Sequence, residues 1–448
     1  MNRYRRLVWG LLFFFLTIAC RYSHAAETPN VFLIISDDQA WTDYSFMRHP
    51  RVQTPHIDRL ARESLTFTRG HVPSSLCCPS LASIITGLYP HQHRITSNDP
   101  SVPAGMTPIQ FSQSPAFQAG REVMNRHLEA VPTLPRVLKE QGYLSLQTGK
   151  WWQGHYRRGG FTHGMTEGQR HGDRGLEIGR ATMQPIYDFL ELSKKEHKPF
   201  FVWYAPLMPH EPHTPPERLL KKYQQETVSP RIARYWGMVE WFDETVGELL
   251  GYLDKQDLAK DTMVVFLADN GWIQSPDRGS YAPKSKQSPY EGGLRTPLLL
   301  RWPGKVQPRT SEIPVLSIDI MPTLLAAIGL QPTSEMQGIN LLDEQAVSNR
   351  KAVCGECFTH NAVDPNDPAA SLRWRWTIEG PWKLIIPDAI NEPNEQAELY
   401  DLVKDPHENT NLASQHADVV ARLSARLNSW WNPVRHRSES SRAPKAFR

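Results

Sequence analysis

The chain has 448 residues, of which 50 are lysine or arginine and 47 are aspartate or glutamate, so its formal charge at pH 7 is +3. A chain of this length holds one large α/β domain with a smaller one, or two to three average domains. The nearly balanced charge gives no reason to expect nucleic-acid binding. Five cysteines are too few for a disulfide-rich scaffold.

Residues 1–25 are predicted to be a secretory signal peptide. A basic start precedes the apolar run Leu7–Ala19, which is too short to favour a membrane span, and Ala25 suits a small-residue cleavage site. We therefore expect a periplasmic or secreted protein. Lipid anchoring at Cys20 is the weaker alternative, because Thr17 stands where a lipoprotein signal prefers leucine. No later segment is long and apolar enough to predict a transmembrane anchor.

Short apolar runs alternate with helical patterns through the next part of the chain. The apolar runs indicate buried strands of a parallel sheet: Val31–Ser36, Leu144–Thr148, Phe200–Tyr204 and Met263–Ala268. The helical patterns lie at Thr54–Glu63, Thr133–Gln141 and Arg231–Leu253. This alternation favours an α/β fold with a mostly parallel sheet. Asn98–Asn125 shows no period and is rich in proline, glutamine and serine, which predicts a long surface loop.

The pattern changes near Val353. Two β-rich runs flank Glu379-Gly380-Pro381, which indicates a hairpin, and Ala413–Trp430 has the pattern of a final amphipathic helix. A small antiparallel sheet with a helix is therefore expected here. The expected units are an α/β domain at 29–350, a smaller subdomain at 351–432, and a basic, disordered tail at 433–448.

Cys354 and Cys357 have C-x-x-C spacing, which is found in redox and half-zinc sites. Neither a second C-x-x-C nor a thioredoxin-like context accompanies them. A local disulfide or two unpaired thiols is therefore the preferred interpretation.

Polar side chains follow three of the predicted strands. Asp37-Asp38, Lys150 and Asp269-Asn270 each come shortly after an apolar run. The carboxyl ends of parallel strands gather at one edge of a sheet, so these groups are expected to converge. Three carboxylates and an amide suit Ca²⁺, with Mg²⁺ as the alternative. Solvated acidic loops are the competing interpretation.

The stretch Ser75–Gly87 (SLCCPSLASIITG) resembles the sulfatase signature C-x-P-S-R with its closing T-G. Cys77 takes the cysteine position, whereas Leu81 stands where the family has arginine. In that family the cysteine is oxidised to formylglycine (3-oxoalanine), and the hydrated aldehyde attacks the sulfur of a sulfate ester. The resemblance therefore implies a formylglycine-generating enzyme as maturation partner. A Cys-Cys-Pro-Ser turn leading into an apolar helix is the structural alternative.

A second block, Leu134–Gly154, resembles the sulfatase block that ends in G-K-W-H-x-G. It implies that Lys150 contacts sulfate. The family histidine, which touches the formylglycine hydroxyl, is replaced by Trp152. Trp152 is expected either to pack or to stack on a sugar ring. His155, three residues further on, is the candidate substitute, with an ordinary surface role as the alternative.

Two more blocks extend the resemblance. Tyr204–Pro216 carries two H-x-P units, and His210 fits the family histidine that protonates the leaving alcohol better than His213 does. Lys286–Pro297 (KQSPYEGGLRTP) is similar to K-x-x-x-Y-E-G-G-x-R-x-P, which implies that Lys286 is a second sulfate-contacting lysine.

The resemblance covers roughly Pro29 to Trp430, including the ELYDL segment that begins at Glu398. It implies an alkaline-phosphatase-like domain, with a mostly parallel sheet flanked by helices and a smaller C-terminal antiparallel sheet. The implied activity is hydrolysis of a sulfate ester on a carbohydrate, with calcium as cofactor. Its implied ligands are Asp37, Asp38, Asp269 and Asn270. A phosphate or phosphonate ester hydrolase and a non-catalytic binder of sulfated glycans remain the alternatives.

Overall fold

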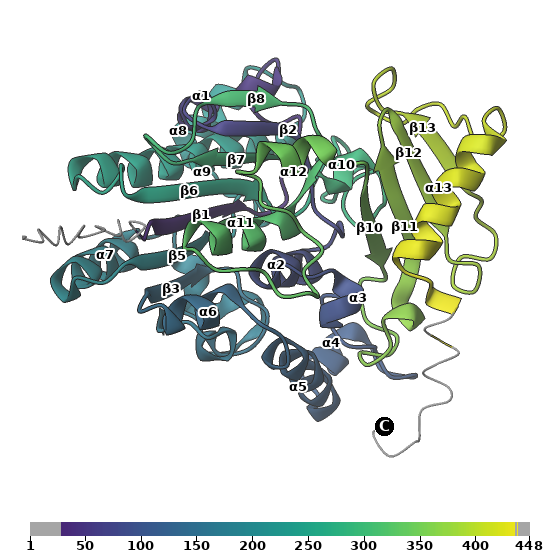
Figure 1. Cartoon of the computed structure of the whole chain (residues 1–448), viewed down its shortest axis with the longest axis horizontal. Coiled ribbons are helices and arrows are strands. Elements are labelled where there is room, and N and C mark those ends of the chain that lie inside the picture. Colours follow the sequence, from purple (N-terminus) through teal and green to yellow (C-terminus); the bar gives the residue numbers. More distant parts are fainter. Residues whose placement is uncertain (1–27, 435–436, 438–448) are drawn as a thin grey trace, which may run out of the picture.

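The computed structural model describes residues 28–434 and Arg437. The predicted signal peptide, Cys20 and nearly all of the predicted tail lie outside the described residues. Two sheets organise the described chain (Figure 1). Across residues 28–434, no helix has the combined length and apolar character that crossing a membrane requires.

The larger sheet is nine-stranded and mostly parallel, as expected. Its strands follow the order β4 (His163–Gly164), β3 (Leu144–Gly149), β5 (Phe200–Ala205), β1 (Asn30–Ser36), β6 (Thr262–Ala268), β7 (Arg295–Arg301), β2 (Leu65–His71) and β8 (Arg309–Ser311). A short strand, β9 (Val315–Leu316), also pairs with β2. Strand β7 is antiparallel to both of its neighbours, β6 and β2.

Helices cover both faces of this sheet. One face packs on α2 (Cys77–Thr86), α5 (Pro115–Glu129), α6 (Leu134–Glu140), α11 (Ile320–Ala327) and α12 (Glu344–Asn349). The other packs on α1 (Pro55–Arg62), α7 (Gln184–Glu196) and α9 (Pro230–Lys255). Leu33 joins the first core and Ile34 the second, because successive side chains of a strand point to opposite faces. Burial on both faces explains why the central strands are apolar throughout.

The predicted loop at Asn98–Asn125 is wrong. The segment contains α4 (Pro108–Ser112) and most of α5. The hydroxyl oxygen of Ser114 accepts a hydrogen bond from the amide of Phe117, and a proline follows at the first helical position. Both features are common signals of a helix start. The helix is then held by burial of its apolar face against the core.

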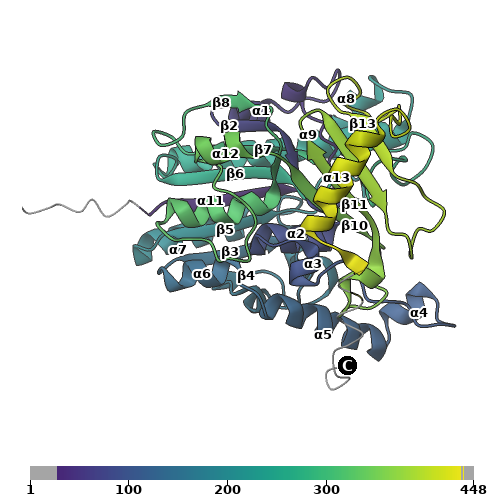
Figure 2. The same ribbon diagram turned by 45° about the vertical axis from the view of Figure 1, so that its right-hand side comes forward.

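The smaller sheet is antiparallel, with strands β10 (Val353–Phe358), β11 (Leu372–Glu379), β12 (Trp382–Pro387) and β13 (Glu398–Asp401). The predicted hairpin is present, with Glu379 opposite Trp382. Helix α13 (Ala417–Trp430) lies across the outer face of this sheet (Figures 1 and 2). The inner face packs on the large domain through residues such as Trp376 and Leu294. Three short helices complete the fold: α3 (Pro90–His93), α8 (Glu217–Gln224) and α10 (Glu291–Leu294).

The C-x-x-C pair consists of two unpaired thiols. All four cysteines within the described part of the chain are free and buried. Cys354 packs under α13, whereas Cys357 packs toward the large domain. Residues three apart on a strand point to opposite faces, so strand geometry separates the two sulfurs.

A buried ionic group ties the two sheets together. The ammonium of Lys383 on β12, which is 0% exposed, lies 2.9 Å from a carboxylate oxygen of Glu291 and 2.9 Å from one of Glu408. Glu291 also lies 3.2 Å from Nε2 of His71 on β2. Glu291 begins α10 and lies within the sequence block Lys286–Pro297, so this ionic group couples the small sheet to that block.

We predict that Lys383→Met lowers the free energy of unfolding by about 3–5 kcal/mol, because it leaves two buried carboxylates without their cation. The matched control is Lys404→Met, whose side chain is 84% exposed, and which is expected to change stability by less than about 0.5 kcal/mol. Urea unfolding followed by circular dichroism measures both. A loss below about 1 kcal/mol for Lys383→Met would show that the group contributes little.

Candidate active site

The predicted convergence at the carboxyl ends of the strands is present. Nζ of Lys150, just after β3, lies 2.6 Å from Oδ1 of Asp37, just after β1. The amide Nδ2 of Asn270, after β6, donates to Oδ1 of Asp38 at 2.7 Å. Nζ of Lys286 contacts both oxygens of Asp38 at 2.7 Å. Three strands and one loop thus bring five charged or polar side chains into a single buried cluster.

Cys77 begins α2 and faces this cluster. Its Sγ lies 3.9 Å from Oδ1 of Asp38, and the side chain is 1% exposed. Burial raises the pKa of the Cys77 thiol to about 12, although Lys150 and Lys286 oppose the shift. An unmodified thiol here is therefore protonated at neutral pH and is a poor nucleophile.

The carboxylates have the features of a cation site. Among the described residues, Oδ2 of Asp37, Oδ2 of Asp269 and Oδ1 of Asn270 are buried without a hydrogen-bond partner. Burial raises the pKa of Asp269 well above its usual range, and the nearby charge of Asp37 raises it further. Such oxygens fit a hard divalent cation, which supplies the missing partner and relieves the repulsion. Asp37, Asp38, Asp269 and Asn270 could hold it.

His210 joins the cluster, whereas His213 does not. Nε2 of His210 lies 3.4 Å from Oδ2 of Asp38, and its Nδ1–H donates to the carbonyl of Glu211 at 2.8 Å. That bond fixes the tautomer and leaves Nε2 facing the site. Burial lowers the pKa of His210. The ring of His213 packs instead 5.4 Å from that of Tyr235, beside a cavity of about 550 Å³.

The loop that carries Lys286 is set by close backbone packing. A Cβ on Gly292 would lie 2.3 Å from the carbonyl oxygen of Lys284, and one on Gly293 would lie 2.2 Å from that of Ser285. Only glycine lets α10 approach the loop so closely. The Gly-Gly pair of the sequence block therefore positions Lys286.

Buried apolar side chains occupy the two positions at which this chain departs from the sulfatase pattern. Leu81 is 2% exposed and packs in the core, one helical turn after Cys77. The side chain of Trp152 is 1% exposed, and its ring lies beneath the guanidinium groups of Arg170 (4.9 Å) and Arg121 (5.4 Å). This burial favours packing over sugar stacking for Trp152.

His155 lies apart from the cluster. Its Nδ1 accepts from the amide of Arg157 at 3.2 Å, and its ring packs 4.3 Å from that of Tyr156. It lines a cavity of about 620 Å³ that Trp152 also reaches. Within residues 28–434, no contact joins His155 to Cys77 or to the carboxylates.

His171 is the residue that sequence reasoning missed. Its ring lies 4.3 Å from that of Trp152 and 6.2 Å from that of His210. Burial lowers its pKa, and the charges of Lys150 and Arg170 lower it further, so the imidazole is neutral. The only cue in the sequence was a histidine beside glycine in a turn, which is a weak signal.

The backbone around His171 is strained and firmly tied to the site. His171 has φ of 70°, and its carbonyl accepts from the amide of Trp151 at 3.0 Å. A Cβ on Gly172 would lie 2.5 Å from the carbonyl oxygen of Gly149. The carboxylate of Asp173 accepts from the backbone amides of Glu167, Gly168 and Gln169. The loop thus holds His171 against the strand end that carries Lys150.

Curated proteins similar to this chain include sulfatases. Human N-acetylgalactosamine-6-sulfatase is 29% identical over 365 residues, which cover 71% of this chain and 66%, just under two thirds, of the human protein. The N-acetylgalactosamine-6-O-sulfatase of Bacteroides thetaiotaomicron is 25% identical over 502 residues, covering 90% of this chain and 93% of that protein.

Solved structures share the fold. One, determined in complex with its substrate D-glucosamine-2-N,6-O-disulfate, has a TM-score of 0.71 at 19% identity and covers 94% of this chain and 100% of that one. A phosphonate monoester hydrolase of Agrobacterium radiobacter has a TM-score of 0.67 at 19% identity, covering 91% and 96%. This likeness in fold confirms the predicted fold class, a mostly parallel sheet flanked by helices with a smaller antiparallel sheet.

Family models cover most of the chain. The model described as Sulfatase matches residues 29–330, and the model described as N-sulphoglucosamine sulphohydrolase, C-terminal, matches residues 279–432. With the signature cysteine, both lysines and the carboxylate set gathered in one buried cluster, the chain belongs to the sulfatase family.

Proposed function

We propose that this protein hydrolyses a sulfate ester on a carbohydrate, with formylglycine at position 77 and Ca²⁺ as cofactor. The observation that carries the proposal is the placement of Cys77 at the start of α2, where its sulfur faces Asp38, Lys150 and Lys286. Both curated relatives named above are N-acetylgalactosamine 6-sulfatases, which supports a sulfated amino sugar as substrate. A periplasmic or secreted location and a formylglycine-generating partner are part of the proposal.

Each residue has a role in this reaction that follows from its charge and its position. When formed, formylglycine supplies an oxygen nucleophile, which the buried thiol with a pKa of about 12 does not. Lys150 and Lys286 bind the sulfate oxygens and stabilise the charge that builds on them during attack. Asp37, Asp38, Asp269 and Asn270 would hold Ca²⁺, which would supply further positive charge beside the sulfate oxygens. His210 in its imidazolium form, which the charges of Asp37 and Asp38 favour, gives the proton on Nε2 to the leaving oxygen and becomes the neutral ring whose Nδ1–H bonds to the Glu211 carbonyl.

His171 is proposed to take the place of the histidine that Trp152 replaces. A neutral imidazole accepts a hydrogen bond from a hydroxyl, which is what the formylglycine hydrate presents. The ring packs directly on Trp152, so it occupies the neighbourhood of the missing side chain. His155, the substitute suggested by sequence spacing, has none of these contacts.

The nucleophile is tested with two adjacent variants, made in a host that has the maturation enzyme. We expect Cys77→Ala to lower turnover of N-acetylgalactosamine 6-sulfate by roughly 10³-fold or more. Cys78→Ala is the matched control, since Cys78 is equally buried but bonds to Gln153, and it should remain active. Peptide mass spectrometry should find the aldehyde at residue 77 alone.

The same assay separates the alternatives. Turnover of phosphate or phosphonate esters in preference to sulfate esters would replace the proposed reaction with that of the phosphonate hydrolase. Binding of sulfated sugars without turnover, in protein that carries the aldehyde, would favour a non-catalytic binder. Full activity with an unmodified thiol at residue 77 would contradict the formylglycine mechanism.

For the histidines, we predict that His171→Ala lowers kcat by ~10²–10³-fold, as loss of one acid–base or hydrogen-bonding group does. His155→Ala should match wild type within about twofold, since the expected role of His155 is local to its own turn. Steady-state kinetics on the same substrate, with circular dichroism to check folding, measures both. Wild-type kcat in His171→Ala, or a larger loss in His155→Ala, would show that His171 has no such role.

A further inference from the structure

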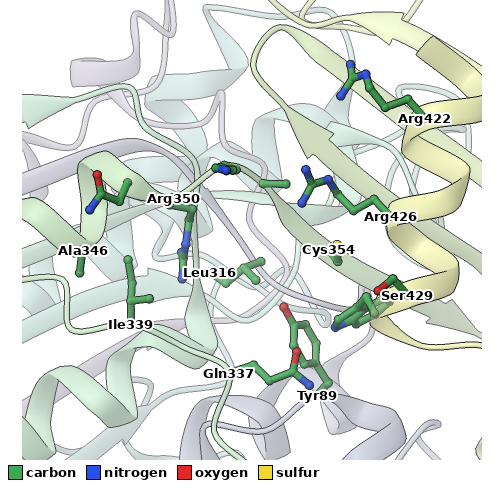
Figure 3. A pocket seen from close by; sticks show the side chains of 14 residues that line it. Tyr89, Leu316, Gln337, Ile339, Ala346, Arg350, Cys354, Arg422, Arg426 and Ser429 are labelled. Atoms are coloured by element: carbon green, nitrogen blue, oxygen red, sulfur yellow. The ribbon is translucent and has the colours of Figure 1, made fainter. Parts of the chain in front are cut away.

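Another cavity lies between the large domain and the C-terminal subdomain (Figure 3). It measures about 700 Å³, and its lining comes from the start of α3, β9, the segment before β10, and α13. Tyr89 of this lining follows the carboxyl end of α2, whereas Cys77 stands at its amino end. A helix of this length spans roughly 15 Å at 1.5 Å per residue. The cavity is therefore separate from the proposed active site.

The cavity is lined by positive charge. Its lining contains four cationic side chains, and no carboxylate contributes to it among the described residues: the four are Arg350, Lys351, Arg422 and Arg426. Figure 3 shows the guanidinium group of Arg426 reaching from α13 toward Leu316 on the opposite wall. Such a surface attracts anions.

Carboxylates that do not line the cavity themselves pair with the guanidinium groups that do, and orient them. Asp319, 0% exposed, pairs with both Nη atoms of Arg350 at 2.5 and 2.6 Å. A single carboxylate, that of Glu379, is shared by Arg426 (2.5 Å) and Arg422. Since two carboxylates face four cations, two positive charges remain in excess. A guanidinium group that is fixed in place can donate two parallel hydrogen bonds, which suits sulfate and carboxylate groups.

The rest of the lining suits a sugar. Amide and hydroxyl groups come from Gln337, Asn349, Ser429 and Tyr89. The ring of Trp430 lies 4.8 Å from that of Tyr89, and its buried Nε1 has no hydrogen-bond partner within the described chain. Aromatic rings beside amides, hydroxyls and fixed cations are the groups that recognise an anionic carbohydrate.

We propose that this cavity is an auxiliary binding site for an anionic oligosaccharide, which holds one part of a polymer while another part occupies the active site. The assignment of the occupant rests on the proposed function, because it takes the anionic group to belong to the same sulfated polymer. Free sulfate or phosphate shares this anion chemistry and is the competing occupant.

The test uses Arg422→Ala/Arg426→Ala, whose side chains are 50% and 36% exposed, so the fold should persist. Calorimetry with a chondroitin 6-sulfate hexasaccharide, on a Cys77→Ala background that blocks turnover, should show affinity reduced ~10-fold or more. Arg422→Lys/Arg426→Lys, which keeps the charge but loses the fork, should show an intermediate loss. Arg218→Ala, an exposed arginine paired with Glu244 outside the cavity, is the control and should bind as the parent does.

Two further measurements test the site's independence from the active site and distinguish an oligosaccharide from a free anion. With Cys77 intact, turnover of a monosaccharide 6-sulfate should be unchanged in the double variant, because the cavity is remote from the active site. Unchanged hexasaccharide affinity in the double variant would overturn the proposal. Inorganic sulfate that binds tightly in EDTA and is lost in the double variant would assign the cavity to the free anion and overturn the oligosaccharide. The binding arms do not need turnover, so an inactive wild type would contradict the proposed function alone.

Discussion

The structure depends on the balance of charge at the carboxyl ends of β1, β3 and β6. Three buried carboxylates, those of Asp37, Asp38 and Asp269, face two buried ammonium groups, those of Lys150 and Lys286. With all three carboxylates ionised, one negative charge is in excess, and the raised pKa of Asp269 reflects the free-energy cost of holding that charge in a buried site without a cation. A divalent cation at the unpartnered oxygens would turn this excess into one positive charge, and that complements a singly charged sulfate ester. On this account the metal is what makes the site attractive to its substrate.

The fold brings these groups together from distant parts of the chain. The parallel strands supply the carboxylates and Lys150, while the amino end of α2 supplies Cys77. Lys286 comes from a loop packed against α10, and α10 is held by Glu291 to Lys383 of the small sheet. The C-terminal subdomain therefore supports the active-site loop through one buried ionic group. The same subdomain forms one wall of the cation-lined cavity.

Much of this arrangement was predictable from the sequence because it follows from local patterns. Continuous apolar runs gave the central strands, and polar residues directly after them gave the cluster that includes Asp38 and Asn270. The helices within Asn98–Asn125 are hard to predict because the capping signal at Ser114 lies in a segment rich in loop-forming residues. The sequence points to His155 and not to His171 for a different reason. Spacing along the chain favours a near residue, whereas His171 reaches the site through the close approach of Gly172 to Gly149, which no spacing rule describes.

Calorimetric titration of Ca²⁺, followed by inorganic sulfate, tests the charge balance most directly. The account predicts one Ca²⁺ per chain in the wild type and greatly weakened binding in Asp269→Asn, which keeps the shape of the side chain but removes its charge. Sulfate should then bind at the active site only when Ca²⁺ is present, measured in the Arg422→Ala/Arg426→Ala background so that the cation-lined cavity does not contribute. Absence of Ca²⁺ binding in the wild type, or equal sulfate affinity with Ca²⁺ and with EDTA, would contradict the account.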